Sequence, residues 1–203
     1  MDKPLTAVAL NCTLKPSPGE SSTDVIIDQL AEQLQEHSVS CETVRLVDRN
    51  VAPGVEADMG SGDEWPQILE KISGADILIF ATPTWLGHMS SVAQRALERL
   101  NAAGGETDEQ GRPVMFGKVA ITAVVGNEDG AHAIIADAFQ GLNDIGFSIP
   151  AQGATYWNHE AMNPKDYKDL EETPEAVAAT NRTSAANAVH LAHRLAEAPY
   201  PGQ

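Results

Sequence analysis

Residues 77–90, I-L-I-F-A-T-P-T-W-L-G-H-M-S, carry the strongest indication of the fold. The first five residues are all apolar, which is typical of a strand inside a parallel sheet that helices cover on both faces. Pro83 disfavours helical geometry at Thr82, and we therefore predict that this strand ends sharply there. Ser91 and Gln94 have the spacing of a capping box, which predicts that a helix begins immediately afterwards.

The same alternation of an apolar run with an amphipathic segment repeats along the chain. Polar, irregular segments are predicted at residues 48–63, 101–118 and 155–173. The predicted strands are residues 6–10, 42–47, 77–81, 119–125 and 147–151, and the predicted helices are residues 22–36, 64–73, 90–100, 130–145 and 174–196. Strands that alternate with helices favour an α/β three-layer sandwich, in which a five-stranded parallel sheet has helices on both faces.

We expect one such domain over residues 1–203, with the usual strand order 2-1-3-4-5. In that order the winding direction switches between strands 1 and 3, and ligands bind outside the carboxyl ends of the strands at such a switch point. The loops that follow strands 1, 3 and 4 therefore form the candidate site, and they are residues 11–23, 82–90 and 125–132.

The composition limits the classes of partner. Thirteen Lys and Arg against 29 Asp and Glu give a formal net charge of −16, so we expect neither nucleic acid nor an anionic membrane as a partner. No apolar run is long enough for a signal peptide or a membrane span, and the two cysteines lack CxxC spacing. These features predict a cytoplasmic protein in which Cys12 and Cys41 are free thiols.

The first loop carries five hydroxyl side chains and Lys15 within N-C-T-L-K-P-S-P-G-E-S-S-T-D, residues 11–24. Free backbone N–H groups and the positive end of the following helix create an anion site, which suits a phosphate monoester. The alternative is that Ser21 or Ser22 only caps the helix, with Ser21 and Asp24 as a capping box. GxGxxG and GxxxxGK[ST] patterns do not occur, which excludes a dinucleotide fingerprint and a triphosphate loop and leaves a mononucleotide.

The second and third loops carry glycines at positions that suit a flat ligand. Gly87 permits positive φ and a close approach of the backbone, so that the amides of residues 86–89 face the polar edge of a planar heterocycle. Trp85 either shields one face of that ring or packs against a neighbouring helix. The third loop, V-G-N-E-D-G-A-H over residues 125–132, has two glycines and an Asn for a ring edge, although an ordinary strand-to-helix turn has similar residues.

Three motifs in this order resemble the flavodoxin-like NAD(P)H-dependent FMN reductase family over nearly the whole chain. They are N-C-T-L-K-P-S-P-G-E-S-S-T, P-T-W-L-G-H-M-S and G-N-E-D-G. The resemblance implies a flavodoxin-like fold, FMN as cofactor and NADH or NADPH as electron donor. The chain departs from the family pattern in the first motif, where families of this kind often have an Arg near Lys15 and a Gly in place of Asn11.

The resemblance also implies which residues contact the cofactor. Thr13, Ser22 and Thr23 would hold the FMN phosphate, residues 83–89 would line the ribityl chain and the isoalloxazine, and residues 126–127 would meet the pyrimidine edge. The complete candidate set for cofactor binding is Thr13, Lys15, Ser21, Ser22, Thr23, Pro83, Thr84, Trp85, Leu86, Gly87, His88, Met89, Gly126, Asn127, Glu128 and Gly130.

The implied activity is that of an FMN-dependent NAD(P)H oxidoreductase. Hydride passes from nicotinamide to flavin and then to a small acceptor, which is a quinone, a flavin, a nitro compound or an azo compound. Because the flavin supplies the chemistry, we predict no catalytic side chain, and no residue set has metal-ligand spacing. The alternatives are a flavodoxin-type electron carrier without its own NAD(P)H turnover, which the acidic surface suits, and a binding module without turnover.

The resemblance further implies a homodimer or homotetramer in which a partner chain covers the flavin. Trp157 either contributes to that interface or packs locally. His88, His132 and His159 are interpreted as surface or structural residues rather than as acids or bases.

Overall fold

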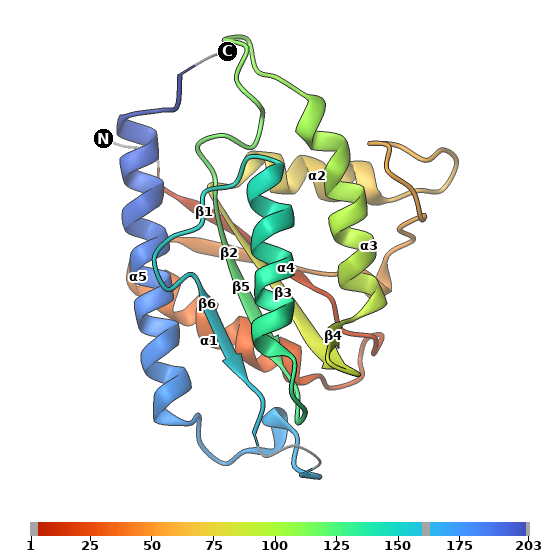
Figure 1. Cartoon of the computed structure of the whole chain (residues 1–203), viewed down its shortest axis with the longest axis vertical. Helices are drawn as coiled ribbons and strands as arrows, with labels where there is room; N and C mark the ends of the chain where they lie inside the picture. Colours follow the sequence, from red (N-terminus) through yellow and green to blue (C-terminus); the bar gives the residue numbers. More distant parts are fainter. Residues whose placement is uncertain (1–3, 160–162, 202–203) are drawn as a thin grey trace.

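The computed structural model of the chain describes residues 4–159 and 163–201 (Figure 1). Five parallel strands form a sheet in the order β2-β1-β3-β5-β6, and a two-residue strand, β4, pairs with β3 in antiparallel fashion. The strands are β1 (Thr6–Asn11), β2 (Ser40–Arg45), β3 (Ile77–Trp85), β4 (His88–Met89), β5 (Val119–Val125) and β6 (Ala154–Trp157). The predicted fold class and strand order are therefore confirmed.

Successive side chains of each central strand enter two different cores. In β3, Ile77 and Ile79 belong to one core whereas Leu78 and Phe80 belong to the other, and all four are at most 1% exposed. Because neighbouring residues in a strand point to opposite faces, a continuous apolar run is what a sheet covered on both faces requires.

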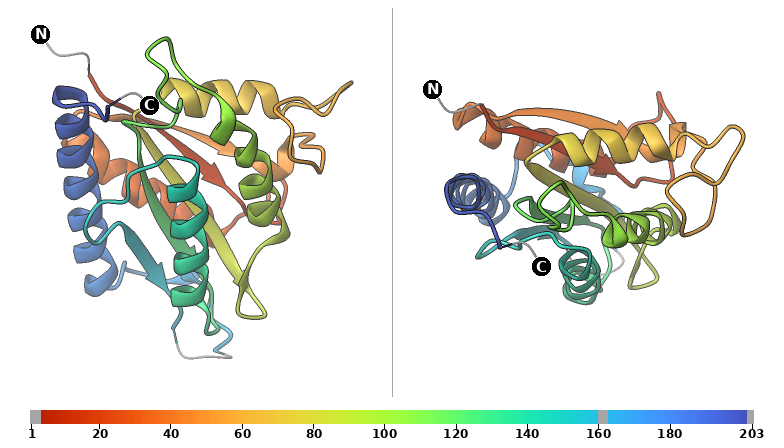
Figure 2. Two further views of the ribbon diagram at one scale, coloured as in Figure 1. Left: turned by 45° about the horizontal axis from the view of Figure 1, so that its top comes forward. Right: turned by 90° about the horizontal axis from the view of Figure 1, so that it is seen from above.

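Helices form a layer on each face of the sheet (Figure 2). Apolar residues of α1 and α5 line the first core, and those of α2, α3 and α4 line the second. The helices are α1 (Ser22–Glu36), α2 (Trp65–Gly74), α3 (Ser91–Leu100), α4 (Ala131–Asp144) and α5 (Glu175–Glu197), and the short 3-10 helices are η1 (Leu46–Asp48), η2 (Asn101–Gly105) and η3 (Tyr167–Asp169).

The prediction that Pro83 ends the central strand was wrong. β3 continues to Trp85, turns through Leu86 and Gly87 at φ values of 53° and 77°, and pairs back on itself through β4. Two successive positive φ values are typical of the tight two-residue turns that match the twist of a hairpin. β3 pairs with β1 only as far as Ala81, so Pro83 lies where that edge is free and a missing N–H is tolerated.

Two other predicted strands were misplaced. The second strand is residues 40–45 rather than 42–47, because the chain turns into η1, where the Asp48 carboxylate accepts bonds from the N–H and the hydroxyl of Ser17. The predicted strand at residues 147–151 makes only one parallel bridge, at Ser148, before the chain turns at residues 151–152. Pro150 has no N–H for a ladder, and the fifth strand forms after that turn, within a segment predicted to be irregular.

The helix starts were predicted with mixed success. Ser21 caps α1, and its hydroxyl accepts from the N–H of Thr23. For α3 the cap is Ser90, whose hydroxyl accepts from the N–H of Ala93 and donates to the carbonyl oxygen of Cys12, so the predicted Ser91–Gln94 capping box was wrong. Ser90 thereby attaches the start of α3 to the end of β1.

Candidate functional site

The hydroxyl-rich loop between β1 and α1 is held by its own side chains. Asn11 ends β1, and its side-chain oxygen accepts from the N–H of Thr13 at 3.0 Å. The Thr13 hydroxyl accepts from the Ser21 hydroxyl at 2.9 Å and from the N–H of Lys15 at 3.3 Å. A hydroxyl has two acceptor sites and one hydrogen, so the hydrogen of Thr13 stays available to a ligand.

Two further hydroxyls of this loop lie at the N-terminus of α1. The Ser22 hydroxyl accepts from the N–H of Lys168 at 3.2 Å, which leaves its hydrogen available. Thr23 is 1% exposed, and its hydroxyl has no hydrogen-bond partner within residues 4–159 and 163–201. A buried hydroxyl without a partner is costly, and here it lines a cavity at the positive end of a helix.

Arg45 and Asp48 hold the loop from behind, and sequence reasoning missed both. Arg45 binds the Asp24 carboxylate at 3.1 Å and donates to the carbonyl oxygen of Gly19. The hydroxyl and N–H of Ser17 lower the pKa of Asp48. Charged residues at the end of an exposed strand, such as Arg45 and Asp48, have no distinctive sequence signal, because such residues are usually solvated.

The β3–β4 hairpin forms the second wall of the cavity. Thr84 is 5% exposed, and its hydroxyl also lacks a hydrogen-bond partner in the described part of the chain. Trp85 is 52% exposed and Leu86 89% exposed. The N–H of Leu86 donates to the Glu128 carboxylate at 2.9 Å, which joins the hairpin to the loop after β5.

Glycines let this hairpin and the loop after β5 approach each other. A Cβ at Gly126 would lie 2.8 Å from the Thr84 side chain, and a Cβ at Gly130 would lie 2.5 Å from the carbonyl oxygen of Gly87. Gly130 also has a φ of 133°, which L side chains rarely adopt. The structure therefore gives these two glycines a packing role, since each permits close contact between the two walls.

A segment after β6 completes the cavity, although no sequence pattern there indicated a site. Tyr167 is buried against Trp157, with ring centroids 5.3 Å apart, and its hydroxyl donates to Gln29 of α1 at 2.6 Å. Burial raises the pKa of Tyr167. The side chain of Asn127 donates to the carbonyl oxygen of Asn163 at 2.7 Å, so this segment is tied to both flanks of the site.

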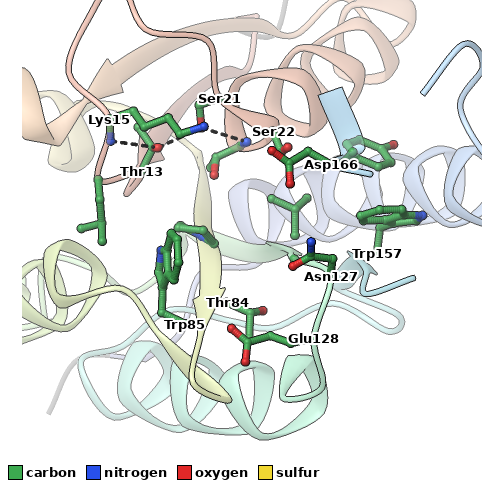
Figure 3. Close-up of a pocket in the computed structure, with 16 residues that line it drawn as sticks. Thr13, Lys15, Ser21, Ser22, Thr84, Trp85, Asn127, Glu128, Trp157 and Asp166 are labelled. Atoms are coloured by element: carbon green, nitrogen blue, oxygen red, sulfur yellow. Dashed lines mark hydrogen bonds between the residues drawn. The ribbon is translucent and has the colours of Figure 1, made fainter. Parts of the chain in front are cut away.

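Figure 3 shows the resulting pocket, which lies at the carboxyl ends of the strands. The lining includes eleven residues of the predicted set: Thr13, Lys15, Ser21, Ser22, Thr23, Pro83, Thr84, Trp85, Gly126, Asn127 and Glu128. It also includes five residues outside that set: Leu14, Val125, Trp157, Asp166 and Tyr167.

The other five candidates are not among the lining residues. Leu86, Gly87, His88 and Met89 form the tip and the return strand of the hairpin, and Gly130 packs against that tip. Trp157 is 8% exposed and packs locally, which is the second of the two interpretations of its pattern.

The remaining histidines and thiols lie elsewhere or are buried. His132 shares a hydrogen bond of 3.0 Å with the Tyr156 hydroxyl, and His159 stacks on Trp157. Burial raises the pKa of the Cys41 thiol to about 11 and raises that of Cys12 still further. Within the described ranges, no group of three or more His, Cys, Asp or Glu is arranged to hold a metal, and no helix there is long and apolar enough to cross a membrane.

Residues 6–162 match the model of a family described as NADPH-dependent FMN reductase. The chain belongs to this family. It is 35% identical over 208 residues to the 8-demethyl-8-aminoriboflavin-5'-phosphate synthase of Streptomyces davaonensis, covering 97% of this chain and 80% of that protein. It is also similar to RosB, whose crystal structure contains bound 8-demethyl-8-formylriboflavin-5'-phosphate, with 33% identity, a TM-score of 0.87, and coverage of 97% of this chain and 82% of RosB.

A third relative is much longer than this chain. The divalent metal cation transporter MntH of Mycobacterium bovis is 34% identical over 198 residues, covering 94% of this chain but only 29% of the transporter. The family match includes the three loops that were predicted from sequence, whereas Asp166 and Tyr167 lie beyond its last matched residue.

Proposed function

We propose that this protein binds FMN in the pocket at the strand ends and catalyses its reduction by NADH or NADPH. Electrons then pass to a small acceptor such as a quinone, a free flavin, a nitro compound or an azo compound. The observation that carries the proposal is the pair of buried, unpartnered hydroxyls on opposite walls, Thr23 and Thr84. A flavin supplies hydride chemistry when bound, so the protein has only to bind, orient and shield it.

The loop after β1 suits the phosphate end of FMN. Ser22 and Thr13 each have a hydroxyl hydrogen that the surrounding bonds leave available, and Thr23 has a hydroxyl with no partner among the described residues. These donors gather at the N-terminus of α1, where the backbone also favours an anion. Lys15 adds one positive charge to the same wall.

The opposite end of the pocket suits a flat ring. Trp85 and Trp157 lie on opposite sides of it in Figure 3, and the Thr84 hydroxyl is available to donate to a ring atom. We assign no side chain the role of general acid or base.

Anaerobic titration tests the proposal. The purified protein is loaded with FMN, and the loss of the flavin absorbance is followed as NADH or NADPH is added. We expect one nicotinamide to bleach the flavin within the time of mixing and an added quinone to restore the colour. Bleaching by dithionite alone would favour a flavodoxin-type carrier instead, and failure to retain FMN would contradict the flavin site itself.

A second candidate function is chemical modification of the flavin. It is favoured by the 35% identity to the 8-demethyl-8-aminoriboflavin-5'-phosphate synthase over nearly the whole chain. The same pocket serves this function with FMN as a substrate rather than a resident cofactor. Mass spectrometry of the flavin recovered after aerobic incubation separates the two candidates, because reduction and reoxidation leave the mass of FMN unchanged whereas modification alters it.

We also propose that the protein is a homodimer or homotetramer. Trp85 and Leu86 present exposed apolar surface beside the pocket, which a partner chain would cover. Light scattering on the purified protein measures the oligomeric state, and a monomer at micromolar concentration would contradict this proposal.

A further inference from the structure

The pocket wall carries a carboxylate that a phosphate site does not need. Asp166 lines the pocket, and Figure 3 shows it beside Ser22, at the end where the hydroxyls gather. It is partly buried, and its carboxylate has no hydrogen-bond or ion-pair partner in the described part of the chain. Its side chain makes no capping bond to η3 either, so local structure does not account for its presence.

The neighbours of Asp166 fix its backbone at this place. The N–H of Lys168 bonds to the Ser22 hydroxyl at 3.2 Å, and Tyr167 is 3% exposed between Trp157 and Gln29. The two residues that follow Asp166 are therefore attached to α1, and the carboxylate is held close to the N-terminus of that helix.

The nearby cations are already engaged or exposed. The Lys168 ammonium binds Asp169 at 2.6 Å, and Arg45 is committed to Asp24 and Gly19 behind the loop. Lys15 is the remaining cation among the residues that line the pocket. The Lys168 ammonium also interacts electrostatically with Asp166, but its hydrogen bond goes to Asp169. A phosphate dianion at the Ser22 hydroxyl therefore meets the negative charge of Asp166.

We propose that Asp166 determines how strongly the pocket distinguishes FMN from riboflavin. The carboxylate repels the phosphate of FMN, whereas it accepts a hydrogen bond from the terminal hydroxyl that riboflavin has in place of the phosphate. Asp166 thus lowers the preference for FMN and leaves the phosphorylated flavin readily exchangeable. This inference rests on the proposed flavin site, and it concerns a residue outside the segment that the family model matches.

Flavin binding to the wild-type protein and two variants tests the proposal. Dissociation constants for FMN and for riboflavin are measured by quenching of flavin fluorescence on the wild-type protein, Asp166→Asn and Asp166→Glu. In Asp166→Asn we expect FMN to bind about tenfold more tightly, as removal of one charge beside a dianion implies. Riboflavin should bind equally or slightly less well, and Asp166→Glu, which keeps the charge, should retain the wild-type preference within about twofold.

Asp137→Asn is the matched control. Asp137 is exposed on α4 and is not among the pocket residues, so this variant makes the same change in net charge away from the site. An unchanged FMN-to-riboflavin ratio in Asp166→Asn, or an equal shift in Asp137→Asn, would overturn the inference while the flavin site stands. Failure of the wild-type protein to bind either flavin would instead overturn the proposed function, and this inference with it.

Discussion

The two ends of the pocket are built in different ways. At the hydroxyl end, Thr13, Ser21 and Thr23 are bonded to one another within a single loop and helix start. At the other end, the contact between Leu86 and Glu128 joins segments 42 residues apart, and the tip of the hairpin packs directly on Gly130. One end is thus organised by local side-chain bonds, and the other by the close approach of two distant backbone segments.

Because the two ends are built differently, substitutions affect their stability in different ways. A local network of hydroxyls loses one or two hydrogen bonds when a member is removed, and each is worth about 1 kcal/mol. A backbone contact that depends on a missing Cβ fails as a whole when a side chain is introduced. We therefore expect a side chain introduced at the second end to cost more stability than the removal of one hydroxyl at the first end.

The largest effect is expected for Gly130→Ala. The new Cβ would lie 2.5 Å from a backbone oxygen of Gly87 and 2.7 Å from its carbonyl carbon, and the residue would keep a φ of 133°. We expect the free energy of unfolding to fall by about 3 kcal/mol, measured by urea denaturation. Gly105→Ala is the control, because a Cβ there meets no atom within 4 Å; a similar loss in both variants would contradict the packing role of Gly130.

Replacing each unpartnered hydroxyl shows which part of the flavin binds at each end of the pocket, because FMN and riboflavin differ only in the phosphate. Thr23→Val should weaken FMN binding about tenfold, equivalent to ~1.4 kcal/mol, and leave riboflavin binding unchanged. Thr84→Val should weaken the binding of both flavins. Since each loses an unsatisfied buried hydroxyl, neither variant should become less stable.

Thr122→Val is the control for this pair. Thr122 is also fully buried without a partner in the described structure, but it lies in β5 and is not among the pocket residues. Flavin titrations should therefore give wild-type constants for Thr122→Val. Loss of FMN affinity in this variant, or its retention in Thr23→Val, would show that the hydroxyl end does not hold the phosphate.

Ser21→Ala should have a smaller effect, confined to the hydroxyl end. The variant loses the cap of α1 and the bond to Thr13, and we expect the free energy of unfolding to fall by ~1 kcal/mol. Thermal denaturation measures the change. Ser38 is an exposed serine after α1 that is not part of the pocket, and Ser38→Ala provides a comparison in which FMN affinity should stay at the wild-type value.

Glu128→Gln should have the smallest effect, at the ring end. Glutamine retains the size of the side chain and an acceptor oxygen, but the bond from the Leu86 amide loses its charge assistance. We expect stability to fall by about 0.5 kcal/mol and the exchange of the Leu86 amide hydrogen to become a few-fold faster. Exchange at the wild-type rate would show that Glu128 does not hold the hairpin.

The difference between local and long-range contacts also explains which parts of the pocket could be predicted from the sequence. The hydroxyl end follows from residues 11–24, because the end of a buried strand, several hydroxyls and a helix cap stand next to one another in the chain. Ser21 was accordingly one of two candidates for the cap, and the family resemblance pointed to Thr13, Ser22 and Thr23, which line the pocket. The α/β alternation was equally local, and the usual strand order of such sheets is the one observed.

The end of the pocket formed by the hairpin and the loop after β5 could not be predicted in this way. The same holds for the segment after β6. β3 passes through Pro83 because its neighbour β1 has already ended, which is a property of the sheet and not of the proline. Lys168 reaches Ser22 across 146 residues, and nothing in a polar segment indicates such a contact. Sequence patterns likewise could not show that Gly126 and Gly130 permit close packing between two loops.

A crystal structure of the protein with bound FMN would show which end of the pocket holds the phosphate. We predict the phosphate within hydrogen-bond distance of Ser22 and Thr23, at the N-terminus of α1, and the ring between Trp85 and Trp157. A reversed ligand, with its phosphate beside Glu128, or FMN bound outside this pocket, would contradict the proposed flavin site.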